Sequence, residues 1–263
     1  MKIGAEFFQN TKDAPADGWI PLPAATVRRA LHRVLPAVSK DETRAHVNSV
    51  LFECDGKMLR AVATDGHRMS VARETVDAAA FKTLLRRPAA RVLDAALEGR
   101  AVDFAIHETG LFVRLNGDAF KVETVSANYP PYESVMPKAA ALSATFDRLS
   151  LRQAIILAAR VDPRGYERCN VRIRVGLDRS VKVTLTQDSL PFAVDCPLAI
   201  EASTEMTIAA RAAYLITALR TVGGERVCAY RENVDPVTPI ALVPAGEPFG
   251  AESLTAVVMP VRE

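Results

Sequence analysis

Histidine is the side chain from which acid–base chemistry is most readily built near neutral pH, and this sequence holds few of them. His67 stands in the run Asp65-Gly66-His67-Arg68, where an imidazole beside a carboxylate could act as a general base. No Gly-x-Ser-x-Gly motif and no second histidine at metal-binding spacing accompany it, and His32, His46 and His107 are scattered singly. An enzymatic role is therefore not expected.

Cysteines and carboxylates give no stronger chemical signal. Cys54, Cys169, Cys196 and Cys228 lie far apart without a Cys-x-x-Cys pair, which argues against structural zinc and a disulfide framework. No cluster of carboxylates for metal ions is apparent, so a nuclease or polymerase is a distant alternative. We expect no metal, no cofactor and a cytoplasmic protein with reduced thiols.

The composition is that of an ordinary globular protein. The chain has 263 residues, of which 49% are hydrophobic and 24% charged, enough for one large domain or two smaller ones. No uncharged stretch approaches the ~20 apolar residues that span a bilayer, and the first residues lack the apolar core of a secretory signal. A membrane partner is therefore not expected.

Positive charge is concentrated on the segments that have helical periodicity. Residues 24–40, 81–91, 148–168 and 206–220 together carry 15 basic and 2 acidic residues, although the net charge of the chain is only +2. Solvated basic faces would explain any one segment, but four segments of one sign are typical of a layer that neutralises phosphates. Because no aromatic residues interleave with the arginines, duplex DNA is favoured over single strands.

The residues predicted to contact the DNA backbone come from these segments and the loops beside them. They are Arg28, Arg29, Arg33, Lys40, Arg44, Lys82, Arg87, Arg91, Arg152, Arg164, Arg168 and Arg211.

The chain repeats one order of elements after roughly 122 residues, a distance at which Asn48 matches Asn170 and Thr64 matches Thr186. Each copy reads as a helix, a charged loop, a strand pair, a second helix and closing strands. The predicted helices are residues 22–38, 88–97, 149–161 and 209–221. The predicted strands are 47–54, 58–63, 101–106, 111–115 and 119–125, then 171–175, 181–186, 227–230, 238–243 and 255–259.

Short turns between neighbouring strands imply antiparallel sheets. The fold class is therefore α+β, with two similar domains that each place two helices on one face of antiparallel sheets. We assign residues 1–19 to an N-terminal polar arm, 20–140 to the first domain and 141–263 to the second. Residues 139–143 are the expected linker.

Five segments in register resemble the bacterial DNA sliding clamp, the beta subunit of DNA polymerase III. The strongest is Leu59-Arg60-Ala61-Val62-Ala63-Thr64-Asp65-Gly66-His67-Arg68-Met69. The others are residues 39–44 with Asn48 and 51–53, 129–138, 235–239 and 257–262. The resemblance covers about residues 20–263, namely the middle and last domains of the clamp. It implies domains built to form a ring around duplex DNA and a processivity factor without chemistry of its own.

The resemblance also implies a hydrophobic pocket that captures short peptides of polymerases and other DNA enzymes, and a clamp-loader ATPase as a further partner. Aliphatic and thioether groups suit the Leu and Phe side chains of such peptides. The residues that carry over are Val47, Thr64, Gly66, His67, Arg68, Met69, Pro137, Val237, Pro239, Val257, Met259, Pro260, Val261 and Arg262. Without the resemblance, Val257 and Met259 would be assigned to the core of a closing strand.

The departures from the clamp pattern concern assembly. This chain shows two clamp-like domains where the family has three, so we expect three chains to close a ring of six domains. The strand 119–123 is predicted to supply an apolar edge through Phe120 and Val122, facing Arg160 and Val161 of the next chain. Arg160-Val161 stands where the family usually has an apolar pair, and the chain ends in Glu263. The alternative is a clamp-derived adaptor that binds partner peptides and never closes a ring.

Overall fold

The computed structural model describes residues 8–97, 102–107, 110–115, 117–138, 141–178, 180–186, 193–196, 199–202, 205–233, 235, 237–247, 250 and 253–261. Contacts divide the chain into two compact units, Met1–Pro131 (unit 1) and Tyr132–Glu263 (unit 2). The sequence predicts the boundary after residue 140, whereas these contacts assign the short turn η2 (Tyr132–Val135), with its buried Tyr132, to unit 2.

One sheet of unit 1 is built from strands that follow one another along the chain. Its order is β5-β4-β3-β6, from β3 (Ser49–Cys54), β4 (Met58–Thr64), β5 (Arg68–Thr75) and β6 (Phe81–Arg86), and all neighbours are antiparallel. The predicted pairing of β3 with β4 is confirmed, with Leu51 opposite Val62. The turn between β3 and β4 explains the Asp-Gly pair. Gly56 has a φ of 106°, and the Asp55 carboxylate accepts the N–H of Met58.

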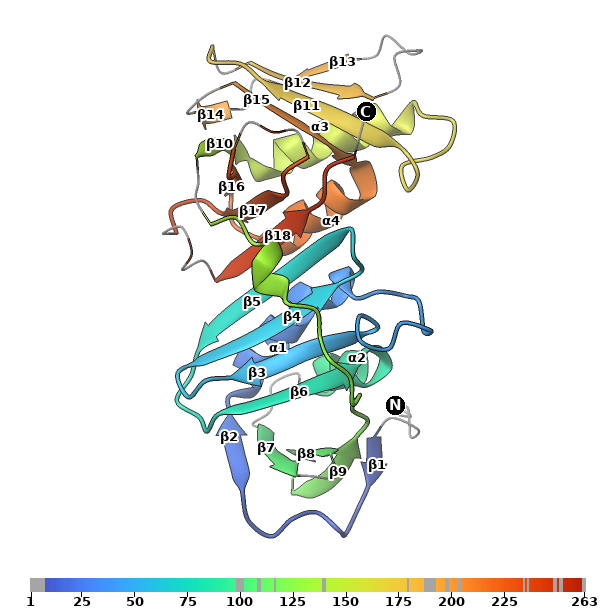
Figure 1. Ribbon diagram of the computed structural model, residues 1–263, viewed down its shortest axis with the longest axis vertical. Helices are drawn as coiled ribbons and strands as arrows, with labels where there is room; N and C mark the ends of the chain where they lie inside the picture. Colours follow the sequence, from blue (N-terminus) through green and yellow to red (C-terminus); the bar gives the residue numbers. More distant parts are fainter. Residues whose placement is uncertain are drawn as a thin grey trace. The chain divides into compact units, whose positions relative to one another are not determined.

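Helices α1 (Ala24–Val34) and α2 (Arg87–Ala96) lie along one face of this sheet and pack against each other (Figure 1). Four apolar residues of α1, Val27, Ala30, Leu31 and Val34, repeat at helical spacing, and all four are buried. The turn η1 (Leu35–Ala37) continues the chain past α1, where Pro36 prevents further helix. Pro88 in the first turn of α2 costs little there, because the first N–H groups of a helix have no intrahelical partner.

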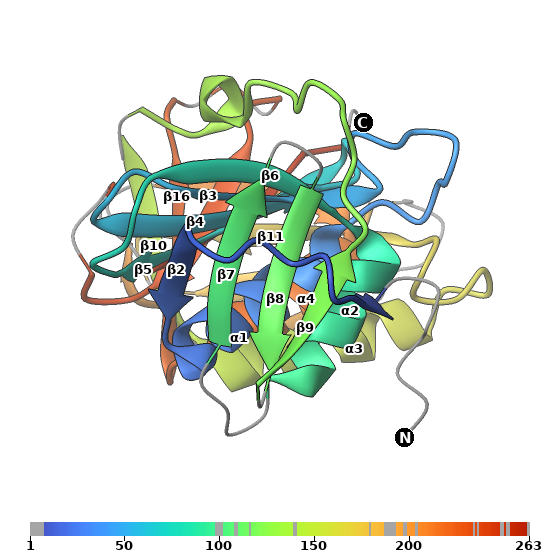
Figure 2. The ribbon, with the colours of Figure 1, turned by 90° about the horizontal axis from the view of Figure 1, so that it is seen from below.

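The second sheet of unit 1 corrects two predictions. Its order is β1-β9-β8-β7-β2, from β1 (Phe8–Asn10), β9 (Asp118–Val122), β8 (Gly110–Leu115), β7 (Val102–His107) and β2 (Trp19–Leu22), as Figure 2 shows. The predicted N-terminal arm, residues 1–19, is therefore partly wrong, because its residues 8–10 pair with β9. The strand 119–123 was predicted to be an edge, yet β9 is covered on both sides, by β8 and β1.

Unit 2 has the same construction. A four-stranded sheet of order β13-β12-β11-β15 comprises β11 (Asn170–Val175), β12 (Val181–Leu185), β13 (Ala193–Cys196) and β15 (Met206–Arg211). A second set of paired strands has the order β14-β10-β16-β17-β18, from β10 (Leu142–Asp147), β14 (Ala199–Ala202), β16 (Arg226–Arg231), β17 (Ile240–Pro244) and β18 (Leu254–Val258). Helix α3 (Arg148–Arg160) packs mainly on the first set, and α4 (Ala212–Val222) mainly on β17 and β18.

The internal repeat extends to strand pairing. The order β2-β7-β8-β9 in unit 1 corresponds to β10-β16-β17-β18 in unit 2, and β4-β3-β6 corresponds to β12-β11-β15. The four helices and the α+β class expected from the sequence are confirmed among the described residues. Predicted helix 209–221 begins too early, because residues 209–211 end strand β15. No helix in the described part of the chain is long and apolar enough to cross a membrane.

Candidate functional site

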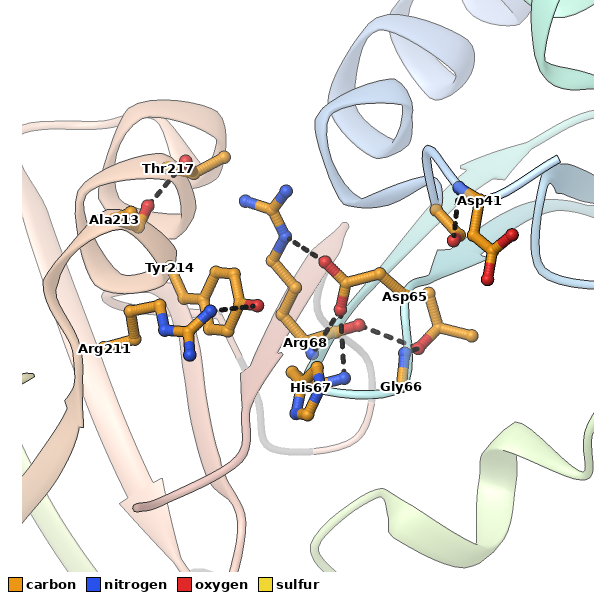
Figure 3. A network of polar contacts seen from close by, with 11 residues as sticks. Asp41, Asp65, Gly66, His67, Arg68, Arg211, Ala213, Tyr214 and Thr217 are labelled. Carbon is orange, nitrogen blue, oxygen red and sulfur yellow. Dashed lines mark hydrogen bonds and ion pairs between the residues drawn. The ribbon is translucent and has the colours of Figure 1, made fainter. Parts of the chain in front are cut away.

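The segment Asp65-Gly66-His67-Arg68 is the turn that joins β4 to β5 in unit 1 (Figure 3). The Asp65 carboxylate accepts the backbone N–H groups of His67 at 2.9 Å and Arg68 at 3.1 Å, and its other oxygen accepts the Arg68 Nε–H at 3.0 Å. Gly66 has a φ of 92°, which favours glycine. The carboxylate that could have served a catalytic histidine instead holds the turn.

Thr64 closes this turn from the other side. Its Oγ1 donates to the Arg68 carbonyl at 2.8 Å and accepts the Gly66 N–H at 3.0 Å, so both ends of the turn are hydrogen-bonded. His67 lies exposed at the tip, and the Arg44 guanidinium lies close to Gly66. Among the described residues no group of three His, Cys, Asp or Glu side chains is placed to hold a metal ion.

Burial divides the peptide-site residues predicted in unit 1. Val47 is 1% exposed and Met69 4% exposed, so both are core residues. Thr64, Gly66, His67 and Arg68 are half-buried or exposed and form its outer surface.

The residues predicted for the peptide site in unit 2 gather at one end of β17 and β18. Ile240 pairs with Val258, so Pro239 and Met259 follow at the same end of the pair. Pro239, Met259, Pro260 and Val261 are half-buried, and the Val261 N–H donates to the Ala209 carbonyl on β15 at 2.9 Å.

Two further residues of this set differ in burial, and a third cannot be placed. Val257 is 1% exposed and is a core residue of β18, whereas Val237, in the loop before β17, is 46% exposed. Arg262 lies outside the described residues. Pro137 is half-buried, and the N–H of the following Lys138 donates to the Glu232 carboxylate, which ties residue 137 to the same loop.

Arg231 holds the loop that presents Val237, and nothing in the sequence pattern singles it out. Its side chain is buried and donates to the Thr207 carbonyl at 2.8 Å, to the Asp235 carbonyl and to Thr238 Oγ1 at 3.1 Å. Burial lowers its pKa, although a guanidinium stays charged at neutral pH. The loop is braced further by the Asp235 carboxylate, which accepts the Val237 N–H at 3.0 Å. A lone arginine at a strand end has no sequence signature that would have predicted this role.

The predicted DNA-binding residues of unit 1 differ in their surroundings. Three of them lie side by side on the outer face of α1, namely Arg28, Arg29 and Arg33. Arg29 and Arg33 both form ion pairs with Glu74 of β5. Lys40, Arg44 and Arg91 are exposed.

Two other basic residues of unit 1 lie differently. Arg87 is half-buried at the start of α2, where burial and the charge of Arg91 lower its pKa. The sequence pattern predicts that Lys82 belongs to a basic helix, but Lys82 lies on β6, and its ammonium group pairs with the Glu53 carboxylate of β3 at 3.3 Å. Strand β6 continues directly into α2, and both carry basic residues, so the distribution of charge does not reveal where the strand ends and the helix begins.

Two of the predicted DNA-binding arginines of unit 2, Arg164 and Arg211, interact with neighbouring side chains of the same unit. Arg164 folds back on Asp162 with contacts of 3.0 and 2.7 Å, which lower the pKa of that carboxylate. Arg211 lies over the Tyr214 ring, 5.1 Å from its centre, and donates to the Tyr214 hydroxyl at 3.2 Å (Figure 3). Arg152 is half-buried on α3, and Arg168 is exposed on the loop after it.

The residues predicted for a subunit interface are unequally accessible. Val122 is buried and Phe120 half-buried on β9, opposite β1. Arg160 and Val161 are exposed at the end of α3, and Leu157 in its last turn is exposed as well.

Comparison with known proteins agrees with this fold. Residues 21–131 match the family described as the central domain of the DNA polymerase III beta subunit. The beta sliding clamp of Vibrio cholerae is 26% identical over 99% of this chain and 70% of its own length. The sliding clamp of Pseudomonas aeruginosa bound to griselimycin superposes with a TM-score of 0.85 at 21% identity, over 97% of this chain and 68% of that one. The beta subunit of Streptococcus pyogenes gives a TM-score of 0.83 over 98% and 70%.

Two successive α+β units with this strand order and this structural likeness define the sliding-clamp fold. Residues 21–131 match the central-domain family of the DNA polymerase III beta subunit, and the whole chain is similar to bacterial beta sliding clamps, of which it spans about 70% of the length.

Proposed function

We propose that this chain acts as a DNA sliding clamp, a processivity factor that surrounds duplex DNA and tethers DNA enzymes to it. The observation that carries the proposal is the match to beta sliding clamps over nearly the whole chain, in sequence and in fold. Such a protein needs no chemistry of its own, because tethering an enzyme to DNA raises the local concentration of that enzyme even when the contact is weak. The alternative of a non-ring adaptor is not favoured by these relatives.

The outer face of α1 and the exposed residues Lys40, Arg44, Arg91 and Arg168 supply sequence-blind contacts to phosphates in this proposal. Many weak contacts of this kind hold a duplex without fixing its register, which is what movement along DNA requires.

The peptide-binding surface proposed in unit 2 is the end of β17 and β18 with the loop that Arg231 holds. Val237, Pro239 and Met259 offer apolar contact there, and the turn at residues 64–69 of unit 1 is the other part of the predicted site. The ligands are short peptides of replicative and repair polymerases. The proposal includes a clamp-loader ATPase, a trimeric ring and a cytoplasmic, nucleoid-associated location.

Retention on circular DNA tests the proposal. Chain loaded on a nicked circular plasmid, with ATP and a clamp loader, should co-elute with the plasmid in gel filtration and be released when one cut linearises the circle. Equal retention on circle and line would indicate ordinary binding, and no retention on either would favour the adaptor.

A matched pair of variants links the retention to the proposed contacts. Replacing the exposed Arg91 and Arg168 with Glu should shorten retention on the circle, because two phosphate contacts become repulsive. Replacing Lys57 and Lys138 with Glu changes the same charge at exposed positions outside the predicted set, and it should have little effect.

A further inference from the structure

Unit 1 contains a groove on the outer face of α1. Its volume is about 420 Å³, and it is lined by Ala25, Arg28, Arg29, His32 and Arg33 of α1 and by Leu97 at the end of α2. The α1 residues stand at helical spacing on one face, so their side chains share one wall. Three guanidinium groups around an open space of this size form a site for an anion.

Two of the arginines that line the groove already pair with a carboxylate of the protein. Glu74 of β5 accepts Arg29 Nε–H at 3.2 Å and Arg29 Nη2–H at 2.8 Å, and it lies 3.4 Å from Arg33 Nη1. The Glu74 side chain is only 12% exposed, whereas that of Arg29 is 52% exposed. The two-pronged contact with Arg29 is the geometry in which a guanidinium also binds phosphate, and it raises the pKa of Arg29.

Another lining residue, His32, forms a second and longer contact with a carboxylate. His32 Nδ1 lies 3.4 Å from Asp94 Oδ2 on α2, and the imidazole is largely exposed. The basic residues that line the groove therefore contact two carboxylates, Glu74 on β5 and Asp94 on α2. Glu74 is the carboxylate that pairs with Arg29 and Arg33.

We propose that this groove binds a backbone phosphate of duplex DNA and that Glu74 is an internal competitor that limits the affinity. A phosphate that enters must share or displace the carboxylate at Arg29 and Arg33, so each contact gains less than an unpaired arginine would give. Weak, replaceable contacts of this kind suit a protein that moves along DNA. The inference rests on the proposed DNA-clamp function and names one residue that sets the strength of the contact.

The test compares two substitutions that change the same charge. E74Q removes the competitor, and D118N removes an exposed acid of the same unit at the start of β9, in the other sheet. Affinity for a short duplex is measured by fluorescence anisotropy over a range of salt concentrations, and melting temperatures verify that all proteins are folded.

E74Q should bind the duplex about three- to tenfold more tightly than the wild type, because a carboxylate no longer occupies two arginines. The salt dependence should steepen by about one, the change expected for one more phosphate contact. D118N should stay within about twofold of the wild type, since only the net charge changes. In the double variant R29Q/E74Q the gain should disappear, because it acts through Arg29.

Three results would overturn the inference. Equal gains for E74Q and D118N would reduce the effect to net charge, and an unchanged affinity of E74Q would show that Glu74 does not compete. If inorganic phosphate at constant ionic strength displaced the duplex more effectively from E74Q than from the wild type, a free phosphate rather than DNA would be the ligand. If the folded wild type bound no duplex even at about 0.05 M salt, the proposed function itself would fail.

Discussion

At the scale of single residues, short acidic side chains hold the turns of this molecule. Asp55 accepts the N–H groups of Lys57 and Met58 and contacts Arg60, and these interactions lower its pKa from 3.8 to about 2. Asp65 plays the same part in the turn at residues 64–68. Sequence alone marks Asp55-Gly56 as a turn, but it leaves the carboxylate of Asp65 open to a catalytic interpretation.

The lowered pKa of Asp55 predicts how stability depends on pH. The folded value lies below the unfolded one, so the contribution of Asp55 is fully present above about pH 4 and is lost as the pH falls toward 2. Asp55→Asn should therefore melt below the wild type at pH 6, and the two melting temperatures should converge near pH 2. Asp77→Asn, at an exposed position between β5 and β6, is the control, and a pH-independent difference for Asp55→Asn would contradict the prediction.

Burial decides which residues can test the peptide site. Met69 is 4% exposed, so a charge there would disturb the core, whereas Val237 is 46% exposed and can be changed with the fold intact. A short peptide with Gln followed by Leu and Phe should bind the chain with micromolar affinity, about −8 kcal/mol. Val237→Asp should weaken it at least about tenfold, since apolar contact is replaced by a charge that must be desolvated.

Isothermal titration calorimetry measures this binding. Leu177→Asp supplies the control, because Leu177 is 65% exposed on the turn between β11 and β12, outside the predicted site. Equal loss in both variants, or full binding by Val237→Asp, would move the site elsewhere.

At the scale of elements, strands that run directly into helices explain where the sequence is ambiguous. β6 passes into α2 at Arg86–Arg87 and β15 into α4 at Arg211–Ala212, without a turn residue at either junction. The helical periodicity of α1 and the Asp-Gly turn between β3 and β4 suffice to predict those elements. The sequence does not predict the strands β1, β2, β5, β6, β10 and β13–β15. Of these, β1, β2, β6, β10 and β15 pair with strands that are not their neighbours along the chain, so no local pattern marks them.

The same limit applies to the groove on α1. Its arginines are evident from the sequence, but their partner Glu74 stands 45 residues away from Arg29 on β5. No local pattern connects a helix with the far end of a later strand, so only the folded chain brings these charges together.

Strand β1 gives an element-scale prediction. β1 covers the outer side of β9, and just beyond it the Thr11 N–H donates to the Ala119 carbonyl at 3.0 Å. Thr11→Pro removes this donor and should loosen β1, so that amides of β9 exchange faster with solvent and the uncovered edge promotes association. Hydrogen exchange and light scattering measure both effects.

Lys12→Pro is the matched control, since the same ring then stands one residue past Thr11. Protection of β9 that is equally reduced in both variants, or unchanged in Thr11→Pro, would show that this hydrogen bond does not secure β1.

At the scale of the whole molecule, ring formation depends on surfaces that the two units offer to other copies. The exposed apolar residues at the end of α3, Leu157 and Val161, stand beside Arg160. On β9, Val122 is buried and β1 occupies the outer edge, so strand pairing through β9 would require β1 to move. Of the two surfaces predicted for the interface, the end of α3 is therefore the one that is exposed and can be tested by substitution.

The last prediction concerns the mass of the assembly. Rings of six similar units require three copies of a chain that contributes two, so the 263-residue chain of 28.5 kDa should show about three times that mass in light scattering. Val161→Asp should reduce the mass to that of a single chain, because an exposed apolar contact is replaced by a charge while the core is untouched. Leu177→Asp makes the same change on a distant turn and should keep the wild-type mass. A wild type that stays at 28.5 kDa at high concentration would support the adaptor, because a single chain of two units cannot close around DNA.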